Sequence, residues 1–421
     1  MANQTIFKNK LPLHKTKLEV FVFILIASIS FSSILFYIYT YKVPIEASKF
    51  PSINITCDGN EINRDNYIEC MFELYSENSD DISPIKSNIK IRGDFNAGRP
   101  KKGYRIELSQ PKTLLGMRKD DDWILFAMYF DIPRIRIKTG FDLWKSLEQK
   151  EYAAIFPELK YVSLYINGEY QGLYLLAEKN DRRLFGLDDA QNNLNTSLII
   201  QKKEPEPFWT YYPNDWEQDW PNEDEDIYIM DEIMTDLIAF FNSADEEFFD
   251  AETGIYTKFD KENLVDFFLF NFFILHKDIW NNNFFIIRNT YPSKFYLIPW
   301  DFDYIFGQKL DRKYKSNENP ESDIHENNVL FSRLISNDDF SETCKKRWFE
   351  LREEVWTEEF VLDMLYDNYE EIKDILKYEA KLVYKSEFKE DINLVVDEAV
   401  EHLFQWIPER LDFCDSYFLN F

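Results

Sequence analysis

Alternating polar and apolar residues mark the first half of the chain. Residues 87–92 (SNIKIR) and 103–108 (GYRIEL) show the period of two that is typical of half-buried strands. Two more apolar segments flank Asn167-Gly168. This dipeptide favours a type I′ turn, because both central residues of that turn need a positive φ. The pattern therefore predicts a β-rich region that includes a hairpin.

Helical periodicity appears at three other places. Residues 131–147 carry apolar side chains at helical spacing, and residues 261–275 follow a candidate N-cap and are apolar nearly all round. The latter segment predicts a buried central helix. Two short strands are expected at 284–288 and 295–298, and the chain is helical and acidic from about residue 340 onward. We therefore predict an α+β fold.

The longest apolar run is residues 20–41, which contains no charged side chain. As a helix it would span about 33 Å at ~1.5 Å per residue, enough for a bilayer core of about 30 Å. Lysines precede the run, so the positive-inside rule predicts a cytoplasmic N-terminus and an exported remainder. This is the pattern of a single-pass membrane protein whose main domain is extracytoplasmic or lumenal. The alternative is a cleaved signal peptide.

Charge separates the two parts of the chain further. The 421 residues carry a formal net charge of −28, with +4 in residues 1–42 and −32 in the rest. Such an acidic chain argues against nucleic-acid binding, which requires a basic face. Residues 204–226 hold nine acidic residues, no basic ones and three tryptophans. We interpret this segment as a surface insertion or lid, either a solvated loop or a docking site for basic protein segments.

The four cysteines form no CxxC pair, which argues against zinc fingers and thioredoxin chemistry. In an exported domain they predict two disulfides. Proximity in sequence favours Cys57–Cys70 and Cys344–Cys414, although four cysteines allow three connectivities.

Candidate chemistry begins at the end of the predicted central helix. Asp278 and Asn283 stand five apart, the spacing of the catalytic base and the metal-binding Asn in a protein-kinase catalytic loop. Phosphoryl transfer needs a carboxylate to orient the attacking hydroxyl and a nearby neutral oxygen ligand for Mg²⁺. Asp301 follows two strands later, and Asp303 shares its face in an extended chain. Paired carboxylates are ligands that Mg²⁺ or Mn²⁺ prefers beside phosphates.

The loop between the first two predicted strands is a candidate phosphate-binding segment. Residues 93–103 contain three glycines and two lysines. Kinases cover the phosphates with such a loop and place a cation against them. The Walker pattern is excluded, because the Lys-Ser/Thr that follows its second glycine is missing.

Together these residues resemble the CotH family of atypical secreted protein kinases. The resemblance covers about residues 85–310 in the family's order. It rests on Arg92-Gly93, on residues 100–108 (PKKGYRIEL), 121–125 (DDWIL) and 165–178 (YINGEYQGLYLLAE), and on residues 300–303 (WDFD). It implies a diverged protein-kinase-like fold with a β-rich N-lobe and a helical C-lobe. It also implies ATP with Mg²⁺ or Mn²⁺, and transfer to Ser or Thr of exported or surface proteins.

The resemblance also assigns roles to residues. Asp278 corresponds to the catalytic base, and Asn283 and Asp301 to metal ligands, with Asp303 as an additional oxygen. Lys102 corresponds to the phosphate-contacting lysine, with Lys101 and Arg105 as rivals in a phosphate region that starts at Arg92 and Gly93. Glu178 corresponds to a hinge residue or an acidic partner, Asp142 is a further candidate partner for the lysine, and Arg136 matches an arginine common on the family's helix.

The predicted organisation has five parts. A short basic cytoplasmic tail (1–19) and a transmembrane helix (20–41) precede a linker with an irregular β region (42–84). The kinase-like catalytic domain (85–320) and an acidic helical C-terminal region (321–421) that packs on it follow.

Two functions remain open at this point. The leading one is a membrane-anchored Ser/Thr protein kinase that acts on protein substrates rich in Lys and Arg. The other is a non-catalytic structural or adhesive surface protein on a kinase-derived fold. One departure from the family bears on this choice, because Asp94 stands where the family often has Asn. The added negative charge beside the phosphate loop should weaken ATP binding.

Overall fold

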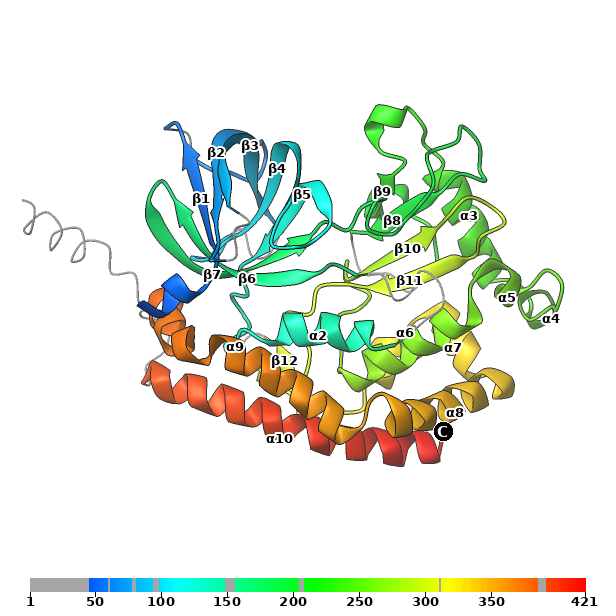
Figure 1. Ribbon diagram of the computed structural model, residues 1–421. Helices are drawn as coiled ribbons and strands as arrows, with labels where there is room; N and C mark the ends of the chain where they lie inside the picture. Colours follow the sequence, from blue (N-terminus) through cyan, green and yellow to red (C-terminus); the bar gives the residue numbers. More distant parts are fainter. Residues whose placement is uncertain are drawn as a thin grey trace, which may run out of the picture. The chain divides into compact units, whose positions relative to one another are not determined.

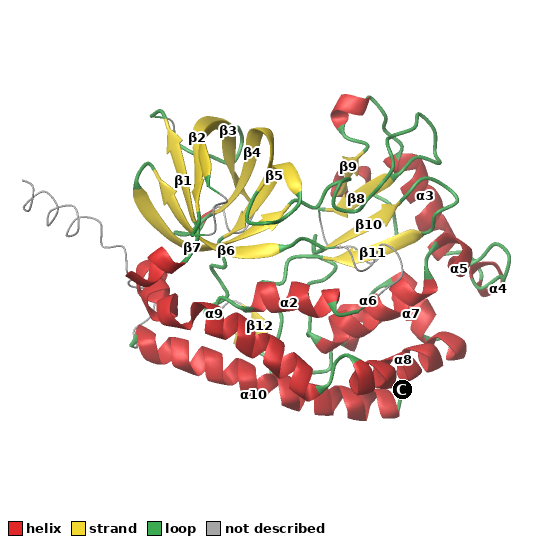
Figure 2. Ribbon diagram, viewed as in Figure 1, coloured by secondary structure: helices red, strands yellow, loops and turns green. Residues whose placement is uncertain are grey.

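The computed structural model describes residues 45–59, 61–77, 81–93, 98–147, 156–203, 208–309, 312–384 and 391–421. The chain divides into two compact units, Met1–Lys49 and Phe50–Phe421. In the first unit the described part is a short 3₁₀ helix, Ile45–Lys49. The fold below is that of the second unit, which combines strands and helices (Figures 1 and 2).

Strands β1 to β7 close into a barrel in the order β1-β2-β3-β4-β5-β7-β6. Neighbouring strands are antiparallel, except that β1 pairs in parallel with β6 to complete the barrel. The β6–β7 hairpin turns at Asn167 and Gly168, which have φ values of +50° and +79°. The predicted hairpin is therefore confirmed. The strands are β1 (Ser52–Cys57), β2 (Ile68–Tyr75), β3 (Ile82–Arg92), β4 (Gly103–Thr113), β5 (Lys119–Phe126), β6 (Leu159–Ile166) and β7 (Glu169–Glu178).

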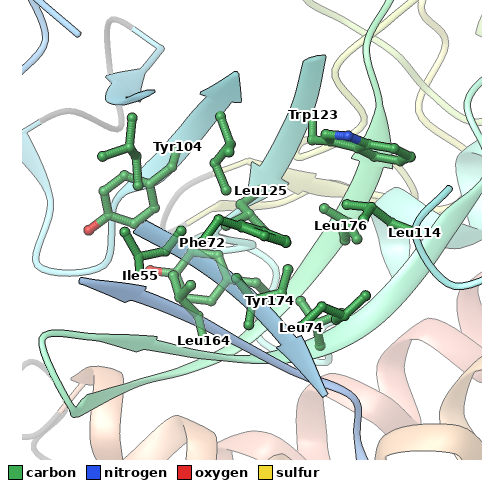
Figure 3. Close-up of a cluster of buried hydrophobic side chains, with 14 of the residues drawn as sticks. Ile55, Phe72, Leu74, Tyr104, Leu114, Trp123, Leu125, Leu164, Tyr174 and Leu176 are labelled. Carbon is green, nitrogen blue, oxygen red and sulfur yellow. The ribbon is translucent and has the colours of Figure 1, made fainter. Parts of the chain in front are cut away.

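Alternation along the strands builds the barrel interior. Most inward positions are apolar, for example Ile89 and Ile91 on β3 and Ile106 on β4. The large side chains of Phe72 and Trp123 are fully buried among them (Figure 3). Because side chains alternate across a strand, the residues between these positions point out of the barrel. This places the polar residues of β3 and β4 on its outer face.

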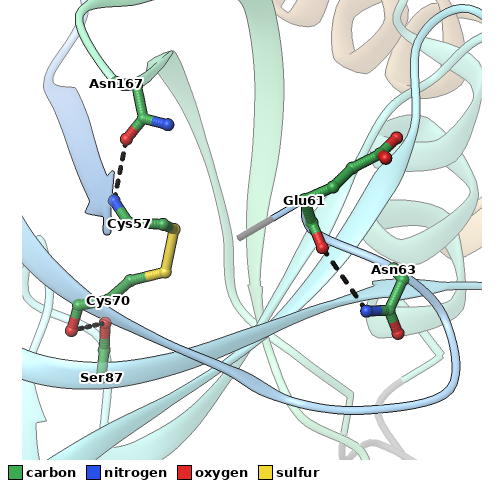
Figure 4. Close-up of a disulfide and its surroundings, with 6 residues drawn as sticks. All are labelled: Cys57, Glu61, Asn63, Cys70, Ser87 and Asn167. Carbon is green, nitrogen blue, oxygen red and sulfur yellow. Dashed lines mark hydrogen bonds between the residues drawn. A yellow bond between two sulfur atoms is a disulfide. The ribbon is translucent and has the colours of Figure 1, made fainter. Parts of the chain in front are cut away.

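A disulfide joins the first two strands of the barrel. Cys57 and Cys70 are direct cross-strand partners, and their sulfur atoms are bonded (Figure 4). The Cys57 amide also donates to Asn167 Oδ1 at 2.8 Å, which ties β1 to the hairpin turn. The structure thus contains the predicted Cys57–Cys70 disulfide.

Replacing both Cys57 and Cys70 with serine is expected to lower the free energy of unfolding by about 2–4 kcal/mol, because the cross-link restricts the unfolded chain. Urea unfolding followed by tryptophan fluorescence would measure this. Reductant should destabilise the wild type and leave the double variant unchanged. Equal midpoints for the two proteins without reductant would contradict the expectation.

The second predicted disulfide is wrong. Cys344 and Cys414 are both buried free thiols. They lie on different long helices, α8 (Asp338–Glu354) and α10 (Ile392–Leu419). Closeness in sequence therefore did not identify a bonded pair, since each thiol is packed as an apolar core side chain.

A second sheet and most of the helices form the rest of the unit. This sheet has the strand order β11-β10-β8-β9. Its strands are β8 (Leu198–Lys202), β9 (Trp216–Trp220), β10 (Phe284–Arg288) and β11 (Phe295–Pro299). The helices are α2 (Arg136–Lys145), α3 (Met230–Phe241), α4 (Asp245–Phe248), α5 (Ile255–Lys258), α6 (Lys261–Phe273), α7 (Val329–Ile335), α8, α9 (Glu358–Tyr384) and α10, with α9 and α10 side by side (Figure 1).

The predicted central helix is confirmed as α6. Asp260 caps it by accepting a hydrogen bond from the Asn263 amide at 2.9 Å. Nearly every side chain of α6 is buried, which explains why its sequence shows no polar face. The two strands expected after it are β10 and β11, which place the residues that follow Pro299 at the end of a buried strand.

The predicted fold class needs two corrections. The β-rich N-lobe is a closed barrel, and the part predicted to be a helical C-lobe contains its own four-stranded sheet. In addition, no helix within the described ranges is long and apolar enough to cross a membrane, so the predicted single-pass membrane protein is not supported. The segment on which that prediction rested, residues 20–41, lies outside the described residues.

Two segments are more regular than the sequence indicated. The region expected to hold irregular β structure contributes β1 and β2, two regular strands of the barrel. The acidic segment interpreted as a lid contributes β9, whose end residues Trp216 and Trp220 are buried, whereas Trp209 is 62% exposed. Only part of this segment is therefore a surface loop.

Candidate functional site

A polar cleft of about 880 Å³ lies between the outer face of the barrel and the second sheet. The segment that follows β7, including Lys179 and Asp181, lines it together with Asp219 and Trp220 of β9 and with Trp300. Basic side chains outnumber carboxylates along its walls, so this site is locally cationic in a chain of net charge −28. The basic lining residues are Arg64, Lys90, Arg92, Arg105, Lys179, Arg182 and Arg183.

Three of these cations share the outer face of β3 and β4. Lys90 is paired directly with Arg105 across the two strands, and Arg92 follows two residues later on the same face. Like charges in directly opposed positions repel one another. Burial and the charge of Arg105 both lower the pKa of Lys90. An anion bound here would relieve that repulsion, which makes this face the best candidate for contacts to phosphate.

Asp278 lies on the loop that follows α6. Its side chain is buried, with Oδ1 3.7 Å from Nε2 of His276. Burial lowers the pKa of His276 to about 3, so the imidazole is neutral. Its Nδ1 lies 2.9 Å from Oδ1 of Asn271, whose amide nitrogen donates to a helix carbonyl. This network assigns the proton to Nδ1 and leaves Nε2 without one near Asp278.

Backbone contacts join the Asp278 loop to the end of β11. The Asn283 side-chain amide donates to the Asp278 carbonyl at 2.9 Å, and the Trp300 amide donates to the Asn283 carbonyl at 2.7 Å. Asp301 follows with a φ of +57°, a left-handed conformation that is uncommon for a non-glycine residue. The loop and the strand end thus form one hydrogen-bonded unit that carries the predicted base and the predicted metal ligands.

Several acidic side chains act electrostatically on the same neighbours. Burial is the main cause that raises the pKa of the Tyr304 hydroxyl, and the charges of Asp303, Asp278 and Asp301 raise it further. Asp301 and Asp303 also act on Arg92, whose pKa is lowered by burial and raised by their charges. Tyr304 is thus within electrostatic reach of Asp278, Asp301 and Asp303, and Arg92 is within reach of Asp301 and Asp303.

The oxygen donors on the loop after α6 and at the end of β11 suit a divalent cation. Burial raises the pKa of the Asp301 carboxyl, and the opposing charge of Arg92 does not cancel this effect. When burial raises the pKa of a carboxyl group, additional positive charge nearby stabilises its ionised form. Carboxylate and amide oxygens, as offered by Asp301, Asp303 and Asn283, are the hard ligands that Mg²⁺ and Mn²⁺ take beside phosphates.

A second acidic group is better explained as part of an ion-pair network. Among the described residues, the one cluster of three acidic ligands close enough to share a metal is Asp120, Asp122 and Asp181. Arg118 lies 2.7 Å from Asp120 and 3.0 Å from Asp181, and Arg183 lies 2.6 Å from Asp120. Because guanidinium groups already neutralise these carboxylates, we do not assign a metal to them.

Lys101 and Lys102, two of the predicted phosphate-binding residues, do not line this cleft. Lys101 is buried, and its Nζ donates to the Leu173 carbonyl and to Oε2 of Glu379 at 2.8 Å. Burial lowers its pKa to about 8 although Glu379 raises it. Both lysines line a separate cavity of about 360 Å³ beside α9. Of the predicted cations, the structure instead brings Arg92 and Arg105 to the cleft.

The other predicted residues have clear local contacts. Gly93 lines the cleft. Glu178 is buried, and its carboxylate accepts hydrogen bonds from the Arg118 and Glu158 amides at 2.8 and 3.1 Å, so it fixes backbone. Asp142, the candidate partner of the lysine, pairs with Lys138 at 3.0 Å.

Two helix-associated residues complete this comparison. Arg136, matched to the family's helix, is buried and pairs with Asp131 at 3.1 Å. The partner of Lys101, Glu379, was missed by sequence reasoning. One signal was available, since Glu379 falls on the apolar stripe of α9 that includes Ile372, Ile375 and Ala380. A charged residue on a buried stripe indicates a buried partner.

Asp219 gives the cleft a pH-dependent stability. Burial raises its pKa to about 6, with Glu217 adding to the effect and Arg105 and Lys179 opposing it. The folded state therefore binds more protons than the unfolded state between about pH 4 and pH 6, and stability falls as the pH rises through this window. Asp219→Asn should stabilise the protein by about 2 kcal/mol at pH 7 and have little effect at pH 4.

Thermal unfolding of the wild type and Asp219→Asn at the two pH values would test this. Asp224→Asn, which changes an exposed carboxylate lining the same cleft, is the matched control and should shift neither transition. An equal gain for Asp219→Asn at pH 4 and pH 7 would contradict the expected role of ionisation.

Comparison with known proteins identifies the class. The family described as CotH kinase protein matches residues 89–414, more than three quarters of the chain, so the protein belongs to the CotH kinase family. This confirms the resemblance seen in the sequence. The protein is therefore related to kinases.

Individual relatives add detail. The chain is 23% identical over 340 residues to the inner spore coat protein H of Bacillus subtilis (strain 168), covering 77% of this chain and 87% of that protein. Solved structures of the Helicobacter pylori proinflammatory kinase CtkA (12% identity, 75% and 94% coverage, TM-score 0.28) and of the golgi casein kinase (11%, 87% and 73%, TM-score 0.27) also match.

Proposed function

We propose that the protein transfers the γ-phosphate of ATP to Ser or Thr hydroxyls of protein substrates, with Mg²⁺ or Mn²⁺. The observation that carries the proposal is that hydrogen bonds join the Asp278–Asn283 loop to the end of β11, where Trp300 lines the cationic cleft and Asp301 follows. A cation, metal-type ligands and a base are the groups that phosphoryl transfer requires at one place. Membership of the CotH kinase family supports the same reaction.

Each group has a distinct part in this reaction. Lys90, Arg92 and Arg105 bind and orient the phosphates on the barrel face of the cleft. Asp278 orients the attacking hydroxyl and accepts its proton at a carboxylate oxygen. Neutral His276 contributes no positive charge that would weaken Asp278 as a base. Asn283, Asp301 and Asp303 would hold the divalent cation, which when bound neutralises charge on the transferred phosphoryl group.

Two measurements on the full chain test this proposal. ATP with Mg²⁺ or Mn²⁺ at a hundred times Kd should stabilise the protein by about 2.7 kcal/mol. Labelled γ-phosphate should enter Ser or Thr of the protein itself or of an added protein substrate. If neither nucleotide-dependent stabilisation nor metal-dependent incorporation is observed, the proposal is wrong.

Basic, Ser/Thr-containing protein segments are the substrates that the surface beside the cleft favours. Asp224 and Glu225 are exposed carboxylates that line the cleft, and the chain around them is strongly acidic. Lys- and Arg-rich segments would be attracted there. Substitution of both carboxylates by Asn and Gln should weaken the preference for Lys/Arg-rich over neutral peptides. An unchanged preference would remove the support for this substrate class.

A second function is favoured by one relative. The similar Bacillus subtilis protein is named a spore coat protein, which suits a structural role in a protein layer. A purely structural protein would show no ATP-dependent stabilisation, so the thermal titration separates the two functions. We favour the kinase because the repulsion between Lys90 and Arg105 on the barrel face would be relieved by a bound phosphate.

A further inference from the structure

The last turns of α9 contact two segments that lead to the candidate active site. Glu379 and Tyr384 stand five residues apart on this helix and are both buried. Glu379 reaches the barrel, whereas Tyr384 reaches the segment that precedes α2. A single helix end thus has two separate sets of contacts.

Glu379 holds the start of β4 through Lys101. Its carboxylate pairs with Lys101 Nζ at 2.8 Å and accepts the Leu173 amide at 2.7 Å. Lys101 in turn donates to the Leu173 carbonyl, so the ion pair satisfies both backbone groups of this residue of β7. Gly172 makes room for it, because a Cβ there would lie 2.7 Å from Glu379 Oε1.

The start of β4 then fixes Arg92. Gly103 follows Lys101 by two residues and is the strand partner of Arg92. A Cβ on Gly103 would lie 3.2 Å from Arg92 Cγ, so the arginine side chain packs directly over this residue. The Arg92 guanidinium lies 4.6 Å from the centroid of the Phe126 ring. Displacement of Lys101 would therefore move the surface on which Arg92 rests.

Tyr384 reaches the metal-ligand segment through aromatic contacts. Its hydroxyl donates to the Tyr129 carbonyl, and its ring lies 5.6 Å from that of Tyr129. The Tyr129 ring packs edge-on against Phe130 at 5.0 Å, and Phe130 lies 5.5 Å from Tyr304. Tyr304 directly follows Asp303 in the chain.

We propose that Glu379 and Tyr384 are positioning residues that fix the two sides of the active site relative to each other. Glu379 acts through Lys101 and Arg92. Tyr384 acts through Tyr129, Phe130 and Tyr304. This inference rests on the proposed kinase function, because the relative position of the two sides matters only if they bind ATP and metal together. It assigns α9 an indirect part in nucleotide binding, although α9 does not line the cleft. Neither residue is a catalytic residue.

Glu379→Gln tests the first contact, and Asp266→Asn is its matched control. Asp266 is a buried carboxylate that pairs with Arg347 at 2.9 Å and joins α6 to α8 away from the cleft lining. Both variants should lower the melting temperature, because each removes a buried carboxylate charge from an ion pair. Only Glu379→Gln should raise the KM for ATP, by about tenfold. An unchanged KM for ATP in Glu379→Gln would overturn the proposal.

The double variant Lys101→Met/Glu379→Gln separates stability from positioning. Removal of both partners of a buried pair largely restores stability. The melting temperature should therefore recover while the KM for ATP stays raised, because the link to α9 is still absent. Recovery of both quantities would show that the pair serves stability alone.

Hydrogen exchange provides a readout that does not need activity. Glu379→Gln and Tyr384→Phe should speed amide exchange in residues 98–103 and 301–306 respectively, and Asp266→Asn should not. If the wild type neither binds ATP nor transfers phosphate, the proposed function fails, but the exchange pattern still decides whether α9 holds these segments. Unchanged exchange in both variants would refute the positioning role.

Discussion

Replacement of Asp278 with asparagine is expected to lower the rate of phosphoryl transfer by a factor of about 10²–10⁴, the usual contribution of a positioned general base. The asparagine side chain has nearly the same shape but does not accept the proton of the attacking hydroxyl. The buried site beside neutral His276 should tolerate it, because removal of a buried charge relieves desolvation. Incorporation of labelled γ-phosphate at saturating ATP would measure the loss.

Two further measurements show what such a loss would mean. ATP-dependent thermal stabilisation should persist in Asp278→Asn, because this residue does not bind the phosphates in the proposed mechanism. Asp236→Asn, an exposed change on α3, should keep the wild-type rate. A variant at position 278 with full activity would exclude Asp278 as the base, and a loss of ATP binding would point to a role in binding instead.

Gly140→Ala is expected to lower activity although Gly140 does not line the cleft. Alanine normally stabilises a helix interior by about 1 kcal/mol relative to glycine. In α2, however, a Cβ at Gly140 would lie 2.8 Å from the ring of Phe302 and 2.9 Å from Ile305. Phe302 stands between Asp301 and Asp303, so its displacement would shift both carboxylates. We expect a loss of about 1–3 kcal/mol in stability from overpacking, and at least a tenfold loss of activity.

Gly98→Ala is the matched control for this substitution. No atom lies within 4 Å of the position that a Cβ on Gly98 would occupy, so alanine should be accepted there. The melting temperature of this variant should stay at the wild-type value. It is a control for stability alone, because Gly98 lies in the loop predicted to cover the phosphates. The expectation for Gly140 is contradicted if its alanine variant is as stable as this control and as active as the wild type.

Local patterns predicted the local structure well. The hairpin at Asn167-Gly168 and the helix after Asp260 were expected because turn and cap signals act between neighbouring residues. Closure of the barrel was not expected, since the pairing of β1 with β6 joins residues more than a hundred positions apart. No short-range pattern encodes such a pairing.

The candidate site was predicted unevenly for the same reason. Asp278 and Asn283 lie in one loop, and their spacing alone was enough to single them out. The phosphate-binding cation was harder to predict, because its identity depends on which lysine or arginine side chain points from the barrel toward the cleft. Lys101 precedes β4 and is held by Glu379, whereas Arg92 ends β3 on the outer face. A partner 278 positions away in the chain decided this outcome.

The parallel pairing of β1 with β6 has a consequence for how the chain folds. During synthesis β1 and β2 can form a hairpin and its disulfide early, since Cys57 and Cys70 are 13 residues apart. The outer edge of β1 then stays unpaired until residues 163–166 have emerged. Unpaired strand edges promote association between chains, and contacts distant in sequence form slowly. The nascent barrel is therefore most exposed to misassembly before β6 arrives, and the β6–β7 hairpin ends that period by covering the edge.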